Sequence, residues 1–332
     1  MNEISIIDSL AENDELLPIH FNYKYLSSVS PRYGHLNGLF NRVKYFIIPY
    51  TITDKKIYKY LTFHSSPFQV NSDCGIKSQQ LYKDFVDSLV IFADKFLGVD
   101  FISQPPPWTI FKYFPRNAIG IEFGSYRSNL LEDESTILSE MNPKHRNMIS
   151  RANRQNFIFK ELEIDHSSLL KVHDILTITM NRSNLPFDKI ENFENKLLSI
   201  RDIAKIFGVF ENNILIACGV FPYSKFAAYY EYGGSLNNNY VGAMNLLHWN
   251  AMLYFKKLGV QYYDFVGARI NPPKSSKYYS IQKFKQGFST TLDAGYIWKI
   301  RITWKYYIYK LNMLIRSPKG DIIDQEKNRT DI

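Results

Sequence analysis

The fold is decided by the stretch Phe226–Phe288, which reads FAAYYEYGGSLNNNYVGAMNLLHWNAMLYFKKLGVQYYDFVGARINPPKSSKYYSIQKFKQGF. It predicts a strand over 226–232, a Gly/Asn-rich turn over 233–243, a helix over 244–259 and a second strand over 261–267. A strand that enters a helix through such a turn directs backbone N–H groups and the positive end of the helix dipole at one place. That place suits an anion such as a pyrophosphate or an RNA phosphate.

The bulk composition indicates a globular protein of two domains. The chain has 332 residues, too many for one typical core, with 45% apolar and 22% charged side chains. Forty Lys and Arg against 32 Asp and Glu give a net charge of +8. A basic balance favours anionic partners such as nucleotides, RNA or an anionic membrane surface, although a lysine-rich composition without functional meaning explains it equally well.

The two cysteines, Cys74 and Cys218, form neither a disulfide framework nor a metal-binding pattern, so no metal is predicted. The N-terminus is acidic and unlike a signal peptide, and no apolar run is long enough to cross a membrane. We therefore expect a cytoplasmic protein, with peripheral contact at the inner face of the membrane as an open alternative.

The rest of the chain predicts alternating strands and helices. A tight turn at 211–213 predicts a hairpin, and Asn142-Pro143 is a good helix start. The expected strands are 44–53, 59–70, 119–123, 206–210 and 214–221, and the expected helices are 78–97, 134–141, the segment after Pro143 and 168–181. The aromatic, basic tail 296–316 reads either as a strand and helix that complete the first domain or as a segment that rests on an anionic membrane.

The helix after Pro143 carries a basic face. Lys144, Asn147, Arg151 and Arg154 share one side of it, and no acid occurs between Pro143 and Lys160. This pattern is typical of a solvated surface. The alternative is a contact with a phosphate-bearing substrate, in which Lys144 and Arg151 take part.

Three stretches resemble the FemAB-type transferases of the GNAT (N-acyltransferase) superfamily. KHRNMISRANRQNF (144–157) is similar to the basic helix of that family, GGSLNNNYVGAMNLLHWNAMLYFKKLGVQYYDFVGA (233–268) to its loop, helix and "YYDFGG" strand, and IQKFKQGF (281–288) to its closing "FKxGFG". They occur in the family's order and together cover about 45% of the chain by these bounds. The long insertion that would form the family's helical arm is not seen.

The resemblance implies an α/β fold of two GNAT-like domains with mixed, mainly antiparallel sheets flanked by helices. Residues 1–141, completed by 295–332, would form the acceptor domain and 142–294 the transferase domain. The implied activity is formation of an amide bond between an activated acyl or aminoacyl group and an amine on a peptidoglycan or surface-polysaccharide precursor. The donor co-substrate would be aminoacyl-tRNA or acyl-CoA, with no tightly bound cofactor.

Four residues are predicted to be catalytic. Phe284 and Lys285 match the Phe-Lys pair of the family, and a cationic donor at Lys285 could stabilise the oxyanion of an acyl-transfer step. Asp264 alternates with apolar residues on its strand, and Glu231 lies on the preceding strand. Either carboxylate serves as a base for the amine or is held by neighbours for a structural reason.

The remaining predicted site residues would bind substrate. Arg182 matches a family arginine associated with acceptor phosphates. Asn239, Gly242 and Ala243 form the turn into the helix and resemble, faintly, the pyrophosphate loop of CoA-binding GNAT enzymes, so the donor stays open between CoA and tRNA. His248 is expected to be a packed or surface histidine rather than a base.

Two other functions remain possible from the sequence. One is a non-catalytic GNAT-fold binding module that recognises a nucleotide-sugar or a glycan through its many aromatic side chains. The other is an RNA-binding protein that uses the basic helix after Pro143. The sequence does not determine the oligomeric state.

Overall fold

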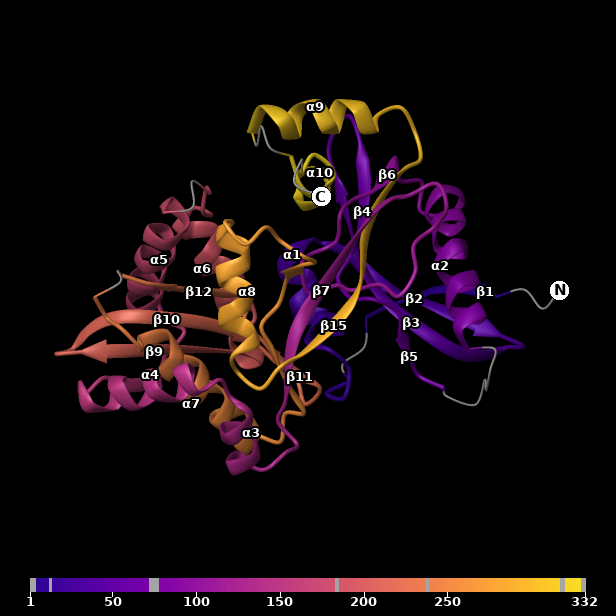
Figure 1. Ribbon diagram of the computed structural model, residues 1–332. Helices are drawn as coiled ribbons and strands as arrows, with labels where there is room; N and C mark the ends of the chain where they lie inside the picture. The colour runs from indigo at the N-terminus through magenta and orange to yellow at the C-terminus, as the bar shows by residue number, and fades with distance from the viewer. Residues whose placement is uncertain are drawn as a thin grey trace.

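The computed structural model describes residues 4–11, 14–71, 78–182, 185–236, 239–316 and 320–329. Figure 1 shows two lobes that are joined along a pair of long strands, β7 (Ile119–Asn129) and β15 (Thr291–Arg301). One lobe carries the N-terminal strands and α2, and the other carries helices α3 to α8 around a smaller sheet. Cys74, the pair 183–184 and the asparagines 237–238 of the predicted turn lie outside the described residues.

The larger sheet has eleven strands among the described residues, in the order β1-β2-β3-β4-β6-β15-β7-β13-β11, with β5 on β3 and β14 on β7. Its pairs are antiparallel except for β4 with β6 and β11 with β13. The remaining strands are β1 (Ser5–Ser9), β2 (Arg32–Phe40), β3 (Val43–Asp54), β4 (Lys59–Phe63), β5 (Phe68–Gln69), β6 (Phe101–Ile102), β11 (Ala227–Tyr229), β13 (Tyr262–Asp264) and β14 (Ala268–Arg269).

Helix α2 (Ser78–Lys95) covers the N-terminal part of this sheet and confirms the helix predicted there. Its stripe of Leu81, Phe85 and Leu89 is buried, because residues three and four apart share one helix face. The expected strand 59–70 is broken into β4 and β5, which pair with different parts of β3.

The smaller sheet has the antiparallel order β12-β10-β9-β8. Helices α4 and α7 pack on one face, and α5 and α6 on the other (Figure 1). The predicted hairpin is confirmed, since Asn212 and Asn213 both have a left-handed backbone that suits a tight turn. The bounds are β8 (Ile158–Leu162), β9 (Ala204–Glu211), β10 (Ile214–Pro222), β12 (Tyr232–Ser235), α3 (Glu134–Glu140), α4 (Pro143–Arg154), α5 (His166–Asn181), α6 (Ile190–Ser199), α7 (Ala243–Lys257) and α8 (Lys277–Gln286).

The single strand predicted over 226–232 is wrong, because the chain changes sheets within it. The N–H of Tyr230 bonds to the Asp264 carbonyl beside the larger sheet, whereas the N–H of Glu231 bonds to the Val220 carbonyl of β10. The expected turn also begins too early, since Gly233 and Gly234 pair with β10 inside β12.

The C-terminal tail confirms the predicted strand and helix. β15 lies between β6 and β7, and it is followed by α9 (Tyr306–Arg316) and α10 (Ile322–Lys327). The short helix α1 (Tyr23–Val29) belongs to the N-terminal region and contacts β2. None of the described helices has the length and apolar character that a membrane span requires. The boundary between residues 141 and 142 stays a prediction.

Candidate active site

The candidate site lies where two parallel strands part. β11 and β13 run side by side from the pair Ala227–Tyr262 to the pair Tyr229–Asp264. Beyond this point the segment after β11 continues into β12 of the smaller sheet. The segment after β13 turns toward β14, which pairs with β7. Crevices at the carboxyl ends of diverging parallel strands are common ligand sites in α/β proteins.

A pocket of about 510 Å³ opens at this divergence. Three of the four predicted catalytic residues, Glu231, Phe284 and Lys285, contribute to its walls. The full lining is Met180, Tyr230, Glu231, Tyr232, Gly233, Phe265, Val266, Ser280, Ile281, Phe284 and Lys285. The strand ends thus form one side of the pocket, and α8 forms another.

Lys285 reaches from α8 across to the turn that follows β13. Its Nζ donates to the carbonyl oxygen of Gly267 at 2.7 Å and to that of Val266. Burial lowers the pKa of Lys285 to about 8, although the charge of Asp264 acts in the opposite direction. An ammonium group has three N–H donors, and these two carbonyls account for two of them within the described residues.

The turn that receives Lys285 has an unusual backbone. Val266 and Gly267 have φ values of 43° and 61°, in the left-handed region. This conformation is unfavourable for a β-branched residue such as Val266, so the surrounding contacts must hold it. The N–H of Val266 donates to Oδ1 of Asp264 at 2.8 Å, and the Val266 carbonyl accepts from Lys285.

Asp264 is fully buried, and both oxygens of its carboxylate accept hydrogen bonds. Its carboxylate accepts from Arg127 Nε at 2.6 Å, from the Ser125 hydroxyl and from the Val266 N–H. Burial alone would lower the pKa of Arg127, but the charges of Asp264 and Asp293 outweigh it and the pKa stands above its ordinary value. This geometry favours the structural role for Asp264, which holds the turn that Lys285 binds.

Glu231 lines the pocket but is also held from behind. Its side chain is only 3% exposed; Oε1 accepts from Lys196 Nζ of α6, and Oε2 from the Tyr25 hydroxyl of α1 at 3.2 Å. Burial raises the pKa of Tyr25, and the Glu231 charge raises it further. For Lys196, the Glu231 carboxylate overcomes the opposite effect of burial and raises the pKa.

Phe284 belongs to an aromatic cluster under the pocket. Its ring lies 5.5 Å from that of His248, 5.2 Å from that of His145 and 5.1 Å from that of Phe288. His248 is fully buried, its Nδ1 lies 2.7 Å from the Tyr263 hydroxyl, and burial lowers its pKa to about 3. His248 is therefore a packed, neutral histidine, as predicted.

Arg182 ends α5 beside the pocket rather than in its lining. The guanidinium donates to Thr179 Oγ1 at 2.9 Å and to the Ser235 carbonyl at the end of β12. Met180, two residues earlier, does line the pocket. Arg182 is exposed, and its contact with an acceptor phosphate stays a prediction.

Lys144 and Arg151 are exposed on α4, together with Asn147 and Arg154, as the helical spacing predicted. The opposite face of α4, with buried Ile149 and Ala152, belongs to the core that α7 shares. Neither basic residue is among the residues that line the candidate pocket. Their role in substrate binding stays a prediction.

The start of α7 has a packing explanation. Gly242 has a φ of 91°, and a Cβ atom at this position would clash with the Met148 carbonyl oxygen of α4. Ala243 is 1% exposed, whereas Asn239 lies on the surface. The close approach of α4 and α7 thus accounts for this glycine, and the binding of a donor by Asn239, Gly242 and Ala243 stays a prediction.

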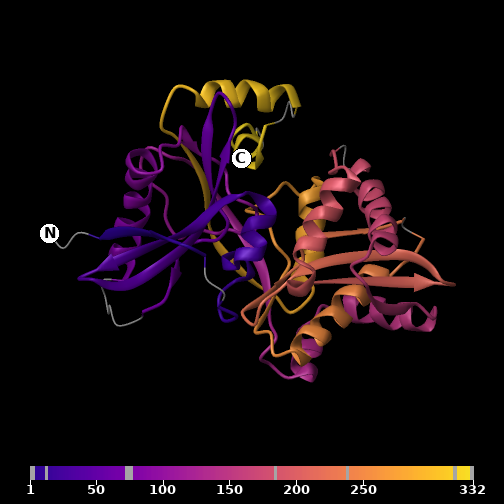
Figure 2. The ribbon, with the colours of Figure 1, turned by 180° about the vertical axis from the view of Figure 1, so that it is seen from behind.

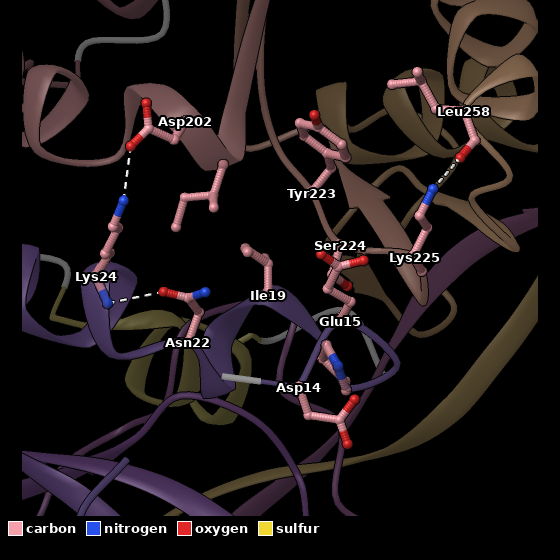
Figure 3. Close-up of a pocket in the computed structure, with 12 residues that line it drawn as sticks. Asp14, Glu15, Ile19, Asn22, Lys24, Asp202, Tyr223, Ser224, Lys225 and Leu258 are labelled. Carbon is pink, nitrogen blue, oxygen red and sulfur yellow. Dashed lines mark hydrogen bonds and ion pairs between the residues drawn. The ribbon is translucent and has the colours of Figure 1, made fainter. Parts of the chain in front are cut away.

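A second pocket, of about 420 Å³, lies between the N-terminal segment and the lobe of α5 to α8. Figure 3 shows its polar groups joined to one another: Lys24 Nζ lies 2.7 Å from Asp202 Oδ2, and Lys225 Nζ lies 2.7 Å from the Leu258 carbonyl. The predicted site residues do not occur among its lining residues. We therefore regard it as a junction between lobes.

No cluster of three or more His, Cys, Asp or Glu in the described residues could hold a metal ion.

Solved structures with the same fold were found, although no protein-family model and no curated protein sequence matches this chain. FemX superposes with a TM-score of 0.65 at 13% identity, over 87% of this chain and 93% of FemX. A tandem GNAT protein from the clavulanic acid biosynthesis pathway gives 0.50 at 7% identity, over 90% and 98% of the two chains. The C-terminal domain of a putative lysylphosphatidylglycerol synthetase from Agrobacterium fabrum gives 0.50 at 13% identity, over 81% and 85%.

These likenesses concern the fold. The fold expected from the sequence, a FemAB-like arrangement of GNAT type with mixed, mainly antiparallel sheets flanked by helices, is confirmed. The sequence did not predict the two residues that hold the Glu231 carboxylate, Tyr25 and Lys196. They lie 206 and 35 residues from Glu231, and no motif connects them to it.

Proposed function

We propose that this protein is an acyl- or aminoacyltransferase that forms an amide bond on an amine of a cell-envelope precursor. The observation that carries the proposal is the pocket at the parting of β11 and β13, where Lys285 and Glu231 face one space of about 510 Å³. The likeness in fold between this chain and FemX, and between this chain and a tandem GNAT protein, supports this class of chemistry.

In the proposed reaction, Lys285 stabilises negative charge. The amine nitrogen attacks the carbonyl carbon of the donor, a C–N bond forms, and the carbonyl oxygen becomes an oxyanion. The remaining N–H of the Lys285 ammonium donates to that oxygen, while the Val266 and Gly267 carbonyls keep the ammonium in place. Collapse of the intermediate breaks the bond to the thiolate of CoA or to the ribose oxygen of tRNA.

Glu231 is proposed to receive the acceptor amine. Its carboxylate is fixed by Lys196 and Tyr25, so it offers a preorganised negative charge to an incoming ammonium group. The amine loses one proton to solvent before attack and a second on forming the amide, and this second proton goes to the leaving thiolate or ribose oxygen. Asp264 acts in this account by positioning Lys285 through the turn at Val266.

The proposed donor is aminoacyl-tRNA or acyl-CoA, and the proposed acceptor is a peptidoglycan or surface-polysaccharide precursor. Contacts from Arg182, Lys144 and Arg151 to phosphates, and from Asn239, Gly242 and Ala243 to the donor, belong to this proposal. Because both donors are present inside the cell, the cytoplasm is the proposed place of action.

A donor competition tests the proposal. Purified protein is incubated with a cell-envelope precursor extract and either a charged tRNA pool or a mixture of acyl-CoA species, with and without RNase. Mass spectrometry should detect an acceptor whose mass has increased by one acyl or aminoacyl group. Loss of that product with RNase identifies tRNA as the donor. Binding of a nucleotide-sugar or glycan without any covalent product from either donor would instead identify a binding module.

A further inference from the structure

Helix α9 carries an apolar stripe on its outer face. The stripe consists of Trp304, Tyr307, Leu311, Leu314 and Ile315, which are 67%, 56%, 63%, 38% and 74% exposed. Their spacing places them on one side of the helix and of the turn that leads into it. Large apolar side chains gathered in this way on a surface mark a place of contact with another body.

The inner face of α9 packs on the larger sheet through other side chains than those of the stripe. The Tyr309 ring lies 4.5 Å from that of Phe101 and 5.7 Å from that of Tyr60, and the Tyr306 ring lies 5.4 Å from that of Phe101. In Figures 1 and 2, α9 forms one edge of the molecule, with no described element beyond it. The helix is thus held on the protein by one apolar face while it presents another.

The surroundings of the stripe are basic. The sequence has no acid between Asp293 and Asp321, whereas Arg301, Lys305 and Lys310 flank the stripe. The Arg301 guanidinium lies over the Tyr307 ring at 5.2 Å. Asp321 is engaged with the buried Lys299 at 2.7 Å. Asp100 pairs with Lys305 at 3.4 Å and offsets part of its charge, so Arg301 and Lys310 contribute most to the basic margins. Trp and Tyr beside aliphatic residues, with Lys and Arg at the margins, are typical of helices that lie in a membrane interface.

We propose that the α9 stripe docks on the surface of an anionic lipid bilayer. A second copy of the chain is a poorer partner, since a two-fold interface would bring the same basic margins face to face. Anionic headgroups complement those margins, and the acyl region accepts the apolar side chains. The inference does not depend on the proposed transferase activity, because docking is measured without donor or acceptor.

The test uses the full-length protein with vesicles of phosphatidylcholine alone or mixed with phosphatidylglycerol. The protein should sediment with the mixed vesicles, and salt should weaken its binding. Trp304 is exposed, whereas Trp298 and Trp249 are buried and the partly buried Trp108 stacks on His20. A blue shift of the tryptophan emission on binding should therefore disappear in Trp304→Phe.

A matched pair of double variants locates the surface. Leu311→Gln with Ile315→Gln should lower the partition coefficient at least tenfold. Ile91→Gln with Phe96→Gln removes two similarly exposed apolar side chains from α2 and the turn that follows it, and should leave the partition coefficient unchanged. Circular dichroism checks that both variants are folded.

Three results would overturn the proposal. Equal sedimentation of the α9 variant and the unchanged protein would show that the stripe is not the contact. Equal binding to vesicles with and without phosphatidylglycerol would remove the role of charge. A dimer in light scattering that the α9 substitutions dissociate, with no binding to either kind of vesicle, would assign the stripe to a second copy.

Discussion

Replacement of Lys285 by methionine should change how the stability of the protein depends on pH. The ammonium group is held at a site where burial lowers its pKa from an ordinary 10.5 to about 8. The folded state therefore disfavours the charged form, and this penalty is fully present below about pH 8. It disappears as the pH rises toward 10.5, because there the unfolded chain also loses the proton.

The size of the effect follows from the shift. A difference of about 2.5 pH units at about 1.36 kcal/mol per unit gives a penalty of about 3 kcal/mol at pH 7. By the same linkage relation about 1 kcal/mol remains at pH 10. Methionine has nearly the same length and no charge, so the free energy of unfolding of Lys285→Met should be nearly independent of this titration. Relative to the variant, the unchanged protein should therefore become more stable by about 2 kcal/mol between pH 7 and pH 10.

Urea unfolding of both proteins at pH 7, 8, 9 and 10 measures the difference between their free energies of unfolding. The contributions of all groups that titrate alike in the two proteins cancel from this difference. Lys283→Met on the exposed side of the same helix is the matched control and should show a constant difference from the unchanged protein. A difference between Lys285→Met and the unchanged protein that does not vary with pH would refute the reasoning. It would mean that Lys285 is as well solvated as an ordinary surface lysine.

The site supports three more predictions. The rate of the proposed transfer, relative to that of Lys285→Arg, should fall as the pH rises through about 8, because Lys285 then loses its proton whereas arginine keeps its proton. Initial rates of both proteins between pH 6 and 9.5 measure this ratio, from which the titration of the acceptor amine cancels. A ratio that stays constant or rises would contradict the role of the charged Lys285. Asp264→Ala should lower the free energy of unfolding by about 3 kcal/mol, because it leaves Arg127 without its buried partner. A loss below about 1 kcal/mol in urea titrations would contradict the positioning role of Asp264. Glu231→Gln should raise KM for the acceptor amine about tenfold while KM for the donor stays constant, since it removes the charge that Lys196 fixes. An equal rise in both KM values would argue against binding of the acceptor by Glu231.

Much of the fold is predictable where local rules dominate. The stripe of α2, the Asn142 cap before Pro143 and the Asn212-Asn213 turn each specify their elements through periodicity or backbone chemistry. The division of 226–232 between two sheets is not predictable in this way. It depends on which distant carbonyls the N–H groups of Tyr230 and Glu231 meet, and a Gly-Gly pair in β12 resembles a turn in sequence.

The candidate site shows the same limit. Phe284 and Lys285 are found by their motif, and the structure places both in one pocket with Glu231. The partners that fix Glu231, Tyr25 and Lys196, come from helices that the tertiary fold brings beside it. The sequence leaves open whether Asp264 is a base, whereas its burial and its three hydrogen bonds favour a structural role.

Turnover of Lys285→Ala tests most directly whether the pocket beside Lys285 performs acyl transfer. With the donor identified by the RNase experiment, initial rates of amide formation are compared among the unchanged protein, Lys285→Ala and Lys283→Ala, and circular dichroism checks that each is folded. We predict that Lys285→Ala loses at least about tenfold in turnover, a lower bound on the loss of about 100-fold or more that is typical of one oxyanion donor. Lys283→Ala should stay near the unchanged rate. A folded Lys285→Ala protein with near-unchanged turnover would contradict the account.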